Sequence, residues 1–232
     1  MISSFELEQL YNLVGDKTWL NEDFLEENLK SSRDLFKERS LLLRRPEPKH
    51  LEVYALLSGL PFPISFSNEL VKKQEEISKI IGNSLNYWVK QNNLGIEYFV
   101  FQWPGKSISK KQISDISNLL YKIKEKSFLL EIRGIQVHQD GCVIAKGFDD
   151  SGVLFRIREY LKENLMGAPK KQSNWAHVPL GRILEPIKEE NFKKLEEYFG
   201  ENKNKKIAKY EIKSIKFIHE TQWYMEKREL IK

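Results

Sequence analysis

The dipeptide Asp140-Gly141 interrupts a long β-rich stretch, and it constrains the fold of this chain more than any other feature. Residues 128–138 before it and residues 142–148 after it both read as strands. A tight turn of this kind needs positive φ angles and joins antiparallel strands into a hairpin. Amphipathic helices are expected on both sides of the hairpin, so the sequence predicts an α+β fold.

Other strand-like and helical segments alternate along the chain. Pro61 and Pro63 end the first strand-like run, and Pro104-Gly105 ends the second. We expect strands at residues 50–58, 94–103, 175–184, 210–219 and 222–230, and helices at residues 68–85, 109–124, 152–165 and 189–199.

The N-terminal part has a different character. Residues 5–40 read as helix, with Leu7, Leu10, Tyr11 and Val14 on one face. The stretch 44–48 contains two prolines and two arginines and breaks the pattern. We therefore predict a helical appendage at residues 1–46 and a main domain at residues 47–232.

Charge separates the same two parts. The chain has 232 residues and a formal charge of +5. Residues 1–50 carry a net −2 and the remainder carries +7, which favours an anionic partner for the main domain. The lysines at 203, 205 and 206 read as a solvated turn.

Compartment and covalent cross-links are constrained by what the sequence lacks. No apolar stretch is long enough for a transmembrane helix, and Met1 to Glu8 do not resemble a signal peptide. The expected location is the reducing cytoplasm. Cys142 is the only cysteine, which excludes a disulfide framework and a cysteine-based metal site.

Two segments of the main domain have the same spacing. A strand opening at Gly95 is followed by a helix and by a returning strand near Phe128, 33 residues later. A strand opening near His177 is followed by a helix and by a returning strand near Lys209, 32 residues later. The equal spacing suggests two related β-α-β lobes, although common element lengths alone can produce it.

His177 is the histidine best placed for chemistry. Val178 and Leu180 lie on one face of its strand, so His177 and Pro179 point to the other face, away from the core. An imidazole titrates near neutral pH and transfers protons, and a hydroxyl two residues later on the same face can donate to a phosphoryl oxygen.

On these residues the sequence resembles the two-histidine (2H) phosphoesterases, including the bacterial LigT-like RNA 2′,3′-cyclic phosphodiesterases, whose signature is a pair of His-x-Thr/Ser-x strands. Residues 177–183 (HVPLGRI) resemble the second motif, and residues 91–98 (QNNLGIEY) occupy the place of the first. The first strand, the central hairpin and the two terminal strands match in order. The resemblance covers about residues 50–232 and leaves out residues 1–46.

The resemblance implies a two-lobed fold with pseudo-twofold related antiparallel sheets, flanked by helices, around one cleft. It implies that two histidines act as general acid and general base on a nucleotide or RNA phosphoester, with paired hydroxyls holding the phosphate and no metal or other cofactor.

This chain departs from that pattern at three of the four signature positions. Gly95 replaces the first histidine, Glu97 its hydroxyl residue and Pro179 the second hydroxyl residue. Loss of an acid–base partner typically costs ~10²–10⁴-fold in rate. Glu97 is a weak candidate for a base, because a carboxylate repels a phosphodiester. Pro179 also lacks a backbone donor, so we expect the strand to be interrupted or at an edge there.

Two neighbours of His177 are candidate ligand-binding residues, together with Gly95 and Pro179. Arg182 suits a phosphate, although a surface salt bridge is the alternative. Trp175 could stack on a base, and the alternative is a role in the core. We expect His138 to be solvated beside its turn and His219 to be exposed at a strand end. No catalytic role is assigned to these two, to His50 or to Cys142.

Two functions follow as hypotheses. In the first, the domain binds or slowly hydrolyses a nucleotide or RNA phosphodiester, a 2′,3′-cyclic phosphate or a 2′-5′ linkage, around His177, with two-histidine catalysis impaired. In the second, the same fold is a non-catalytic RNA-binding or protein-interaction module, with residues 1–46 contacting the protein partner. Neither involves a membrane.

Overall fold

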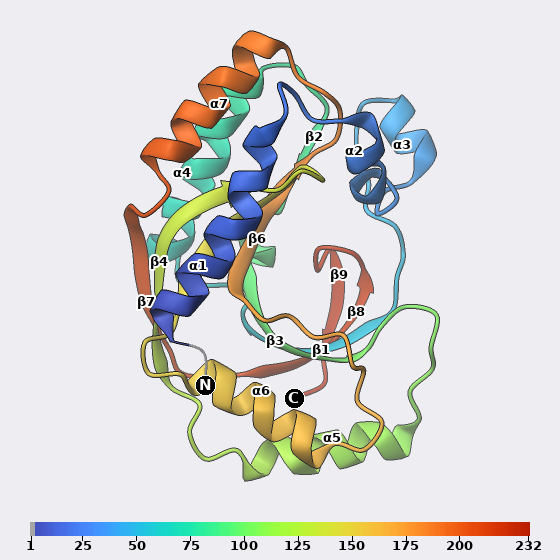
Figure 1. Cartoon of the computed structure of the whole chain (residues 1–232). Coiled ribbons are helices and arrows are strands. Elements are labelled where there is room, and N and C mark those ends of the chain that lie inside the picture. Colours follow the sequence, from blue (N-terminus) through green and yellow to red (C-terminus); the bar gives the residue numbers. More distant parts are fainter. Residues whose placement is uncertain (1–2) are drawn as a thin grey trace.

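The computed structural model describes residues 3–232 and contains two antiparallel sheets flanked by helices (Figure 1). The first sheet has the order β3-β1-β8-β9, and the second has the order β2-β6-β5-β4-β7. Their strands are β1 (Val53–Gly59), β2 (Asn86–Trp88), β3 (Gly95–Gln102), β4 (Phe128–Val137), β5 (Cys142–Phe148), β6 (Ala176–Ile183), β7 (Lys206–Ile212), β8 (Lys216–Gln222) and β9 (Lys227–Leu230). The predicted α+β class is confirmed.

Helices cover the outer faces of both sheets. Helices α4 (Ile64–Ile81) and α7 (Glu189–Glu201) pack against each other and against the second sheet. Helix α6 (Val153–Asn164) packs beside β3, and α5 (Lys110–Lys122) lies next to it below the first sheet (Figure 1). Ser109, the first residue of the predicted helix, is its N-cap and forms a capping box with Gln112. Among the described residues, no helix is long and apolar enough to cross a membrane.

The N-terminal segment consists of several short helices instead of one. They are α1 (Ser4–Gly15), the 3-10 turn η1 (Asp16–Leu20), α2 (Glu26–Arg33) and α3 (Glu38–Leu42). A further 3-10 turn, η2 (Gln91–Asn93), precedes β3. Helix α1 crosses the second sheet on the face opposite α4 and α7 (Figure 1). Leu7, Tyr11, Phe24 and Leu29 join the main hydrophobic core.

The central hairpin forms, with a slightly longer turn than predicted. β4 and β5 pair from Val137 with Val143, and the His138 amide donates to the Cys142 carbonyl at 2.9 Å. The connection therefore spans residues 139–141, and Gly141 has a φ of 78°. A three-residue turn that ends on a left-handed glycine is a common alternative to the two-residue turn.

The end of the chain differs most from the prediction. Residues 210–219 do not form one strand, because the chain leaves the second sheet after β7 and enters the first sheet at β8. The run 222–230 is strand only at β9, and the turn before it holds Tyr224 and Met225 at φ angles of 62° and 58°. The short strand β2 was not predicted, since three residues carry no usable periodicity.

The equal spacing of the two β-α-β segments does not delimit the lobes. β3 and β4, which flank α5, lie in different sheets, whereas β6 and β7, which flank α7, lie in the same sheet without being neighbours. Each lobe is one sheet, and the chain crosses between them several times.

Candidate functional site

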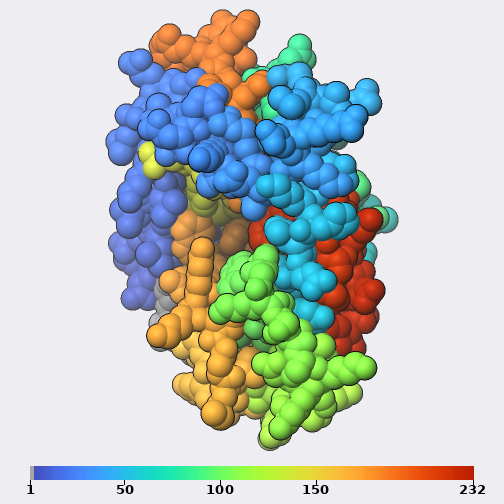
Figure 2. Space-filling view, turned by 90° about the vertical axis from the view of Figure 1, so that its right-hand side faces the viewer, coloured from blue at the N-terminus to red at the C-terminus, as the bar shows by residue number. Residues whose placement is uncertain are grey.

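The candidate site lies between the inner faces of the two sheets. On the second sheet, Lys146 pairs with His177, and Val178 is fully buried on the opposite face toward the core. On the first sheet, Glu97 pairs with Leu57, which belongs to a small hydrophobic cluster separate from the main core. Figure 2 shows the molecule hollowed between the blue N-terminal segment and the orange and green segments below it.

Arg158 of α6 ties the two motif strands together. Its Nη2 donates to the carbonyl oxygens of Glu97 and Trp175, each at 3.1 Å, and its Nε donates to the Tyr98 carbonyl at 2.8 Å. One guanidinium therefore holds the start of β3 beside the start of β6. The two places where the signature motifs belong do come together.

His177 is half-buried on the inner face of β6, as its alternation with Val178 predicts. Its Nδ1 atom is buried and has no hydrogen-bond partner within residues 3–232. Burial, reinforced by the nearby positive charges of His138, Arg158 and Arg182, lowers the pKa of His177 to about 3. The imidazole is therefore neutral at pH 7 and can accept a proton or a hydrogen bond.

The position of the missing first histidine is filled by another side chain. A Cβ atom on Gly95 would lie 3.0 Å from Cγ and 3.1 Å from Cδ2 of Leu60, and 3.1 Å from the Ser58 carbonyl oxygen. Leu60 is itself buried and belongs to the small cluster under β1. A histidine at position 95 would need Leu60 to move aside, so the packing of this chain disfavours a larger side chain there.

Glu97 is half-buried, and a second carboxyl group lies near it. Burial raises the pKa of Glu97 to about 7, with Arg158 opposing the shift. Burial also raises the pKa of Glu220 on β8 to about 8, while the Met225 amide lowers it and the charge of Glu97 raises it further. A carboxyl with a pKa near neutrality has the acidity that suits a general base, but its catalytic role stays a prediction.

Pro179 does not interrupt β6. The strand continues from Ala176 to Ile183, and the missing amide falls where β2 has already ended, since β2 pairs only with residues 181–183. The partner strand shifts register opposite this point, between Val143 and Ile144. At Pro179, β6 is therefore an unpaired edge on the side of β2, whereas it stays paired with β5 on the other side.

Arg182 is committed to an ion pair. Its Nη1 lies 2.7 Å from Asp140 Oδ2 and 2.6 Å from Ser32 Oγ, and its Nε donates to the Tyr224 hydroxyl at 2.6 Å. The salt-bridge alternative is the observed one, with the Arg182 side chain 15% exposed and the Asp140 side chain 35% exposed. A phosphate could reach this guanidinium only by replacing one of these partners.

Trp175 lies on the same side as His177 and is surrounded by rings. Its ring centroid is 5.9 Å from that of His177, 5.2 Å from that of His138 and 5.2 Å from that of Tyr11. The Tyr11 hydroxyl donates to the Gly147 carbonyl and accepts from the Ala176 amide. The N-terminal helix thus holds the wall of the site next to His177.

Two histidines are less exposed than predicted. His138 is half-buried, its Nε2 lies 2.7 Å from Gln136 Nε2, and burial lowers its pKa to about 4 against the opposing charge of Asp140. His219 lies within β8, stacked on Tyr54 at 4.2 Å, with Nε2 buried and unpartnered among the described residues. Both predictions failed because the N-terminal segment and β9 cover these positions.

His50 is exposed, with Nδ1 3.2 Å from the Thr221 carbonyl oxygen.

One group of side chains has metal-ligand chemistry. His138, Asp140 and Cys142 place potential ligand atoms within 4.8 Å of one another. Arg182 is bonded to Asp140, so a cation would have to displace a guanidinium. Burial raises the pKa of the Cys142 thiol to about 11, which also disfavours a thiolate ligand.

Sequence reasoning missed Arg158 and Glu220. Arg158 lies between Leu154 and Leu161 at helical spacing, so it sits in the apolar stripe of α6. A charged residue in such a stripe was the available signal. Glu220 lies two residues after Ile218 and therefore on the same buried face of β8. A charged residue on an apolar strand face was again the available signal.

Comparisons with known proteins place the fold. No family model and no curated protein matches the chain. Among solved structures it is similar to TT0787 of Thermus thermophilus, with a TM-score of 0.56 and 14% identity over 78% of this chain and 95% of that one. A phosphoesterase gives a TM-score of 0.55 at 12% identity over 79% and 96%. LigT of E. coli in complex with ATP gives 0.52 at 11% identity over 79% and 95%. The chain therefore shares the fold of these solved structures.

Proposed function

We propose that the cleft between the sheets binds a nucleotide or RNA phosphodiester, a 2′,3′-cyclic phosphate or a 2′-5′ linkage, at His177, and that two-histidine catalysis is impaired. The observation that carries the proposal is the unpartnered, buried Nδ1 of His177 on the inner face of β6, together with the filling of the space at Gly95 by Leu60. A location in the reducing cytoplasm belongs to the same proposal.

Nucleotide complexes of a protein with this fold support the choice of ligand. LigT of E. coli has been solved with ATP, 3′-AMP, NADP+ and phosphate. In the present chain the cationic groups around His177 are His138 when protonated, Arg158 and Arg182. At pH 7 the two arginines provide the positive potential that a phosphate needs, whereas His138, whose pKa is lowered to about 4, is neutral.

The chemistry available to this site is limited by its single motif histidine. A phosphate next to His177 would raise the pKa of the imidazole, so it could then protonate a leaving oxygen. Glu97 is the described group with the acidity to activate water from the first motif strand. Its repulsion of a phosphodiester makes turnover slow, consistent with a loss of ~10²–10⁴-fold for a missing acid–base partner.

The test is turnover of 2′,3′-cyclic nucleotides and 2′-5′-linked dinucleotides, together with calorimetric titration of the same compounds. His177→Ala should abolish any turnover and weaken binding at least tenfold. His50→Ala, which removes an exposed histidine, should change neither. Unchanged turnover in His177→Ala, or no binding at low salt by the wild-type protein, would overturn the proposal.

A non-catalytic role is the second candidate, and the N-terminal segment favours a protein partner for it. Residues 1–46 expose several large apolar side chains, among them Phe5, Leu13, Leu20, Leu42 and Leu43. Exposed apolar groups of this kind are common at interaction sites. Binding of a labelled RNA at 50 and 200 mM salt distinguishes an RNA-binding module from a protein-interaction module, because phosphate contacts weaken steeply with salt. No RNA binding at either salt leaves only the protein-partner form.

A further inference from the structure

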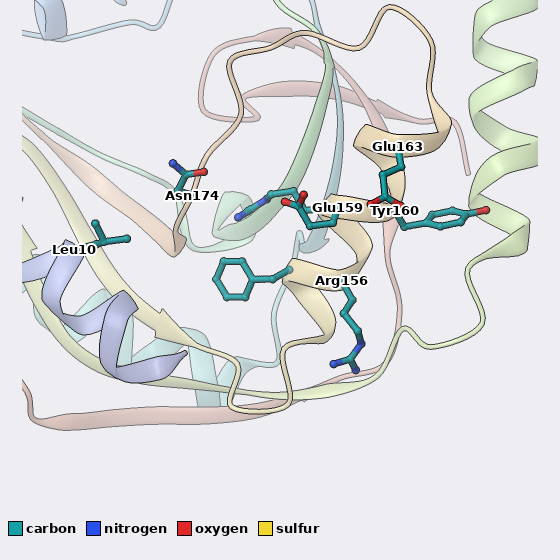
Figure 3. Close-up of a pocket in the computed structure, with 8 residues that line it drawn as sticks. Leu10, Arg156, Glu159, Tyr160, Glu163 and Asn174 are labelled. Atoms are coloured by element: carbon teal, nitrogen blue, oxygen red, sulfur yellow. The ribbon is translucent and has the colours of Figure 1, made fainter. Parts of the chain in front are cut away.

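A groove of about 680 Å³ lies between α1 and α6, next to the candidate site. Its walls include Leu10 of α1, Phe155, Arg158 and Glu159 of α6, and Asn174 just before β6. Figure 3 shows Leu10 of α1 on one side of the groove and Glu159 of α6 on the other, with Asn174 above. The volume is in the range of small-molecule sites.

Arg158 has one unused donor at this groove. The residue is only 1% exposed, and three of its hydrogen bonds go to backbone carbonyls. Its Nη1 is buried and has no partner within residues 3–232. A buried charged donor without a partner is costly, and an anionic oxygen is the partner that a guanidinium binds best.

The same guanidinium connects the groove with His177. Its Nη2 donates to the carbonyl of Trp175, two residues before His177, and its charge contributes to the lowered pKa of that histidine. Nη1 itself has almost no exposed surface, so an anion in the groove reaches it only if the surrounding side chains shift.

The groove favours a ligand with a single negative group. Leu10 and Phe155 offer apolar contact to a nucleobase or a ribose. Glu159 and Glu163 line the same groove, and their carboxylates repel any second phosphate. A polyphosphate or a long RNA strand is therefore disfavoured there, whereas a neutral nucleoside is accepted.

We propose that Arg158 Nη1 anchors the phosphate that His177 faces, and that the groove between α1 and α6 holds one nucleoside. The preferred substrate class is then a nucleoside with one phosphate group, and the N-terminal helix helps to select it through Leu10. This inference rests on the proposed function, because it assumes that a phosphoester meets His177.

Two tryptophan substitutions on α1 test the groove without touching Arg158. Leu10→Trp fills it, and Leu13→Trp is the matched control because Leu13 is 60% exposed on the same helix. The probes are inorganic phosphate, adenosine 3′-monophosphate and ATP, titrated by calorimetry. We expect Leu10→Trp to weaken the binding of adenosine 3′-monophosphate at least tenfold and the binding of phosphate less than twofold. Leu13→Trp should bind both as the wild type does. Wild type should bind ATP at least tenfold more weakly than adenosine 3′-monophosphate.

The outcomes separate this inference from the proposed function. If adenosine 3′-monophosphate binds and His177→Ala weakens it, but Leu10→Trp and Leu13→Trp bind it equally, the groove assignment is wrong and the proposed function stands. If neither phosphate nor nucleotide binds wild type, both fail. Arg158→Lys keeps the positive charge but loses the planar guanidinium group, so it should weaken the binding of phosphate at least tenfold. Should that variant not fold, the tryptophan pair still decides.

Discussion

The substitution Glu97→Gln should stabilise the protein at high pH and leave its stability at low pH nearly unchanged. Burial raises the pKa of this carboxyl from 4.5 to about 7. Between these values the native state binds more protons than the unfolded chain, so the free energy of unfolding falls as pH rises through this window. Glutamine has the same shape and no charge to bury, so it removes this contribution.

The magnitude follows from the shift. One pKa unit corresponds to about 1.4 kcal/mol, so a fully ionised Glu97 costs the native state about 3 kcal/mol. Its side chain is half-buried, and solvent screening reduces the cost to about 1–2 kcal/mol. Ionisation of Glu220, whose pKa is raised to about 8, destabilises the native state in the same direction. The stability of the wild type therefore continues to fall beyond neutral pH.

The assay is urea denaturation of wild type and variant between pH 4 and pH 8. The difference in unfolding free energy should be near zero at pH 4, below the unfolded pKa, and grow to about 1–2 kcal/mol at pH 8. His138 and His177 have lowered pKa values and make both proteins more stable as pH rises toward 6.5, so their contribution cancels in the difference. Glu75→Gln, on the exposed side of α4, is the control and should show no such trend. A difference that stays flat across this range would refute the buried position of Glu97.

Two further substitutions test the packing around the site. Gly95→Ala should destabilise by about 1–3 kcal/mol through overpacking, because its Cβ would meet Leu60 at 3.0 Å; thermal unfolding checks this, and a neutral effect would show that Leu60 does not fill the site. Tyr11→Phe should cost about 1–3 kcal/mol because it leaves the Ala176 amide without its partner and removes the hydroxyl bond to Gly147. Unchanged stability in that variant would mean that α1 is not fixed on the sheet.

Local patterns predicted the elements that depend on neighbours in sequence. The strand of His177, the hairpin around Gly141 and the helix after Ser109 all form, because alternation, turn chemistry and helical periodicity act within a few residues. The face of β6 that carries His177 was also predictable, since the buried Val178 and Leu180 fix it.

Features that depend on contacts between distant segments were not predictable. The burial of His138 requires an N-terminal segment more than a hundred residues away, and the split of residues 210–219 into β7 and β8 requires two sheets. Leu60 fills the space beside Gly95 only because the chain turns sharply after β1. A salt bridge was the sequence alternative for Arg182, but its partner Asp140 was not predictable, because it lies 42 residues earlier on the hairpin turn.

The central claim is that phosphate meets His177, and side-chain nitrogen NMR of the histidines tests it most directly. The chain has four histidines, so single His→Ala variants assign every signal. On titration with inorganic phosphate, the His177 imidazole signals should shift and saturate, with the pKa of His177 rising from about 3, while the exposed His50 stays unchanged. Saturable phosphate binding that leaves the His177 signals where they were would contradict the account.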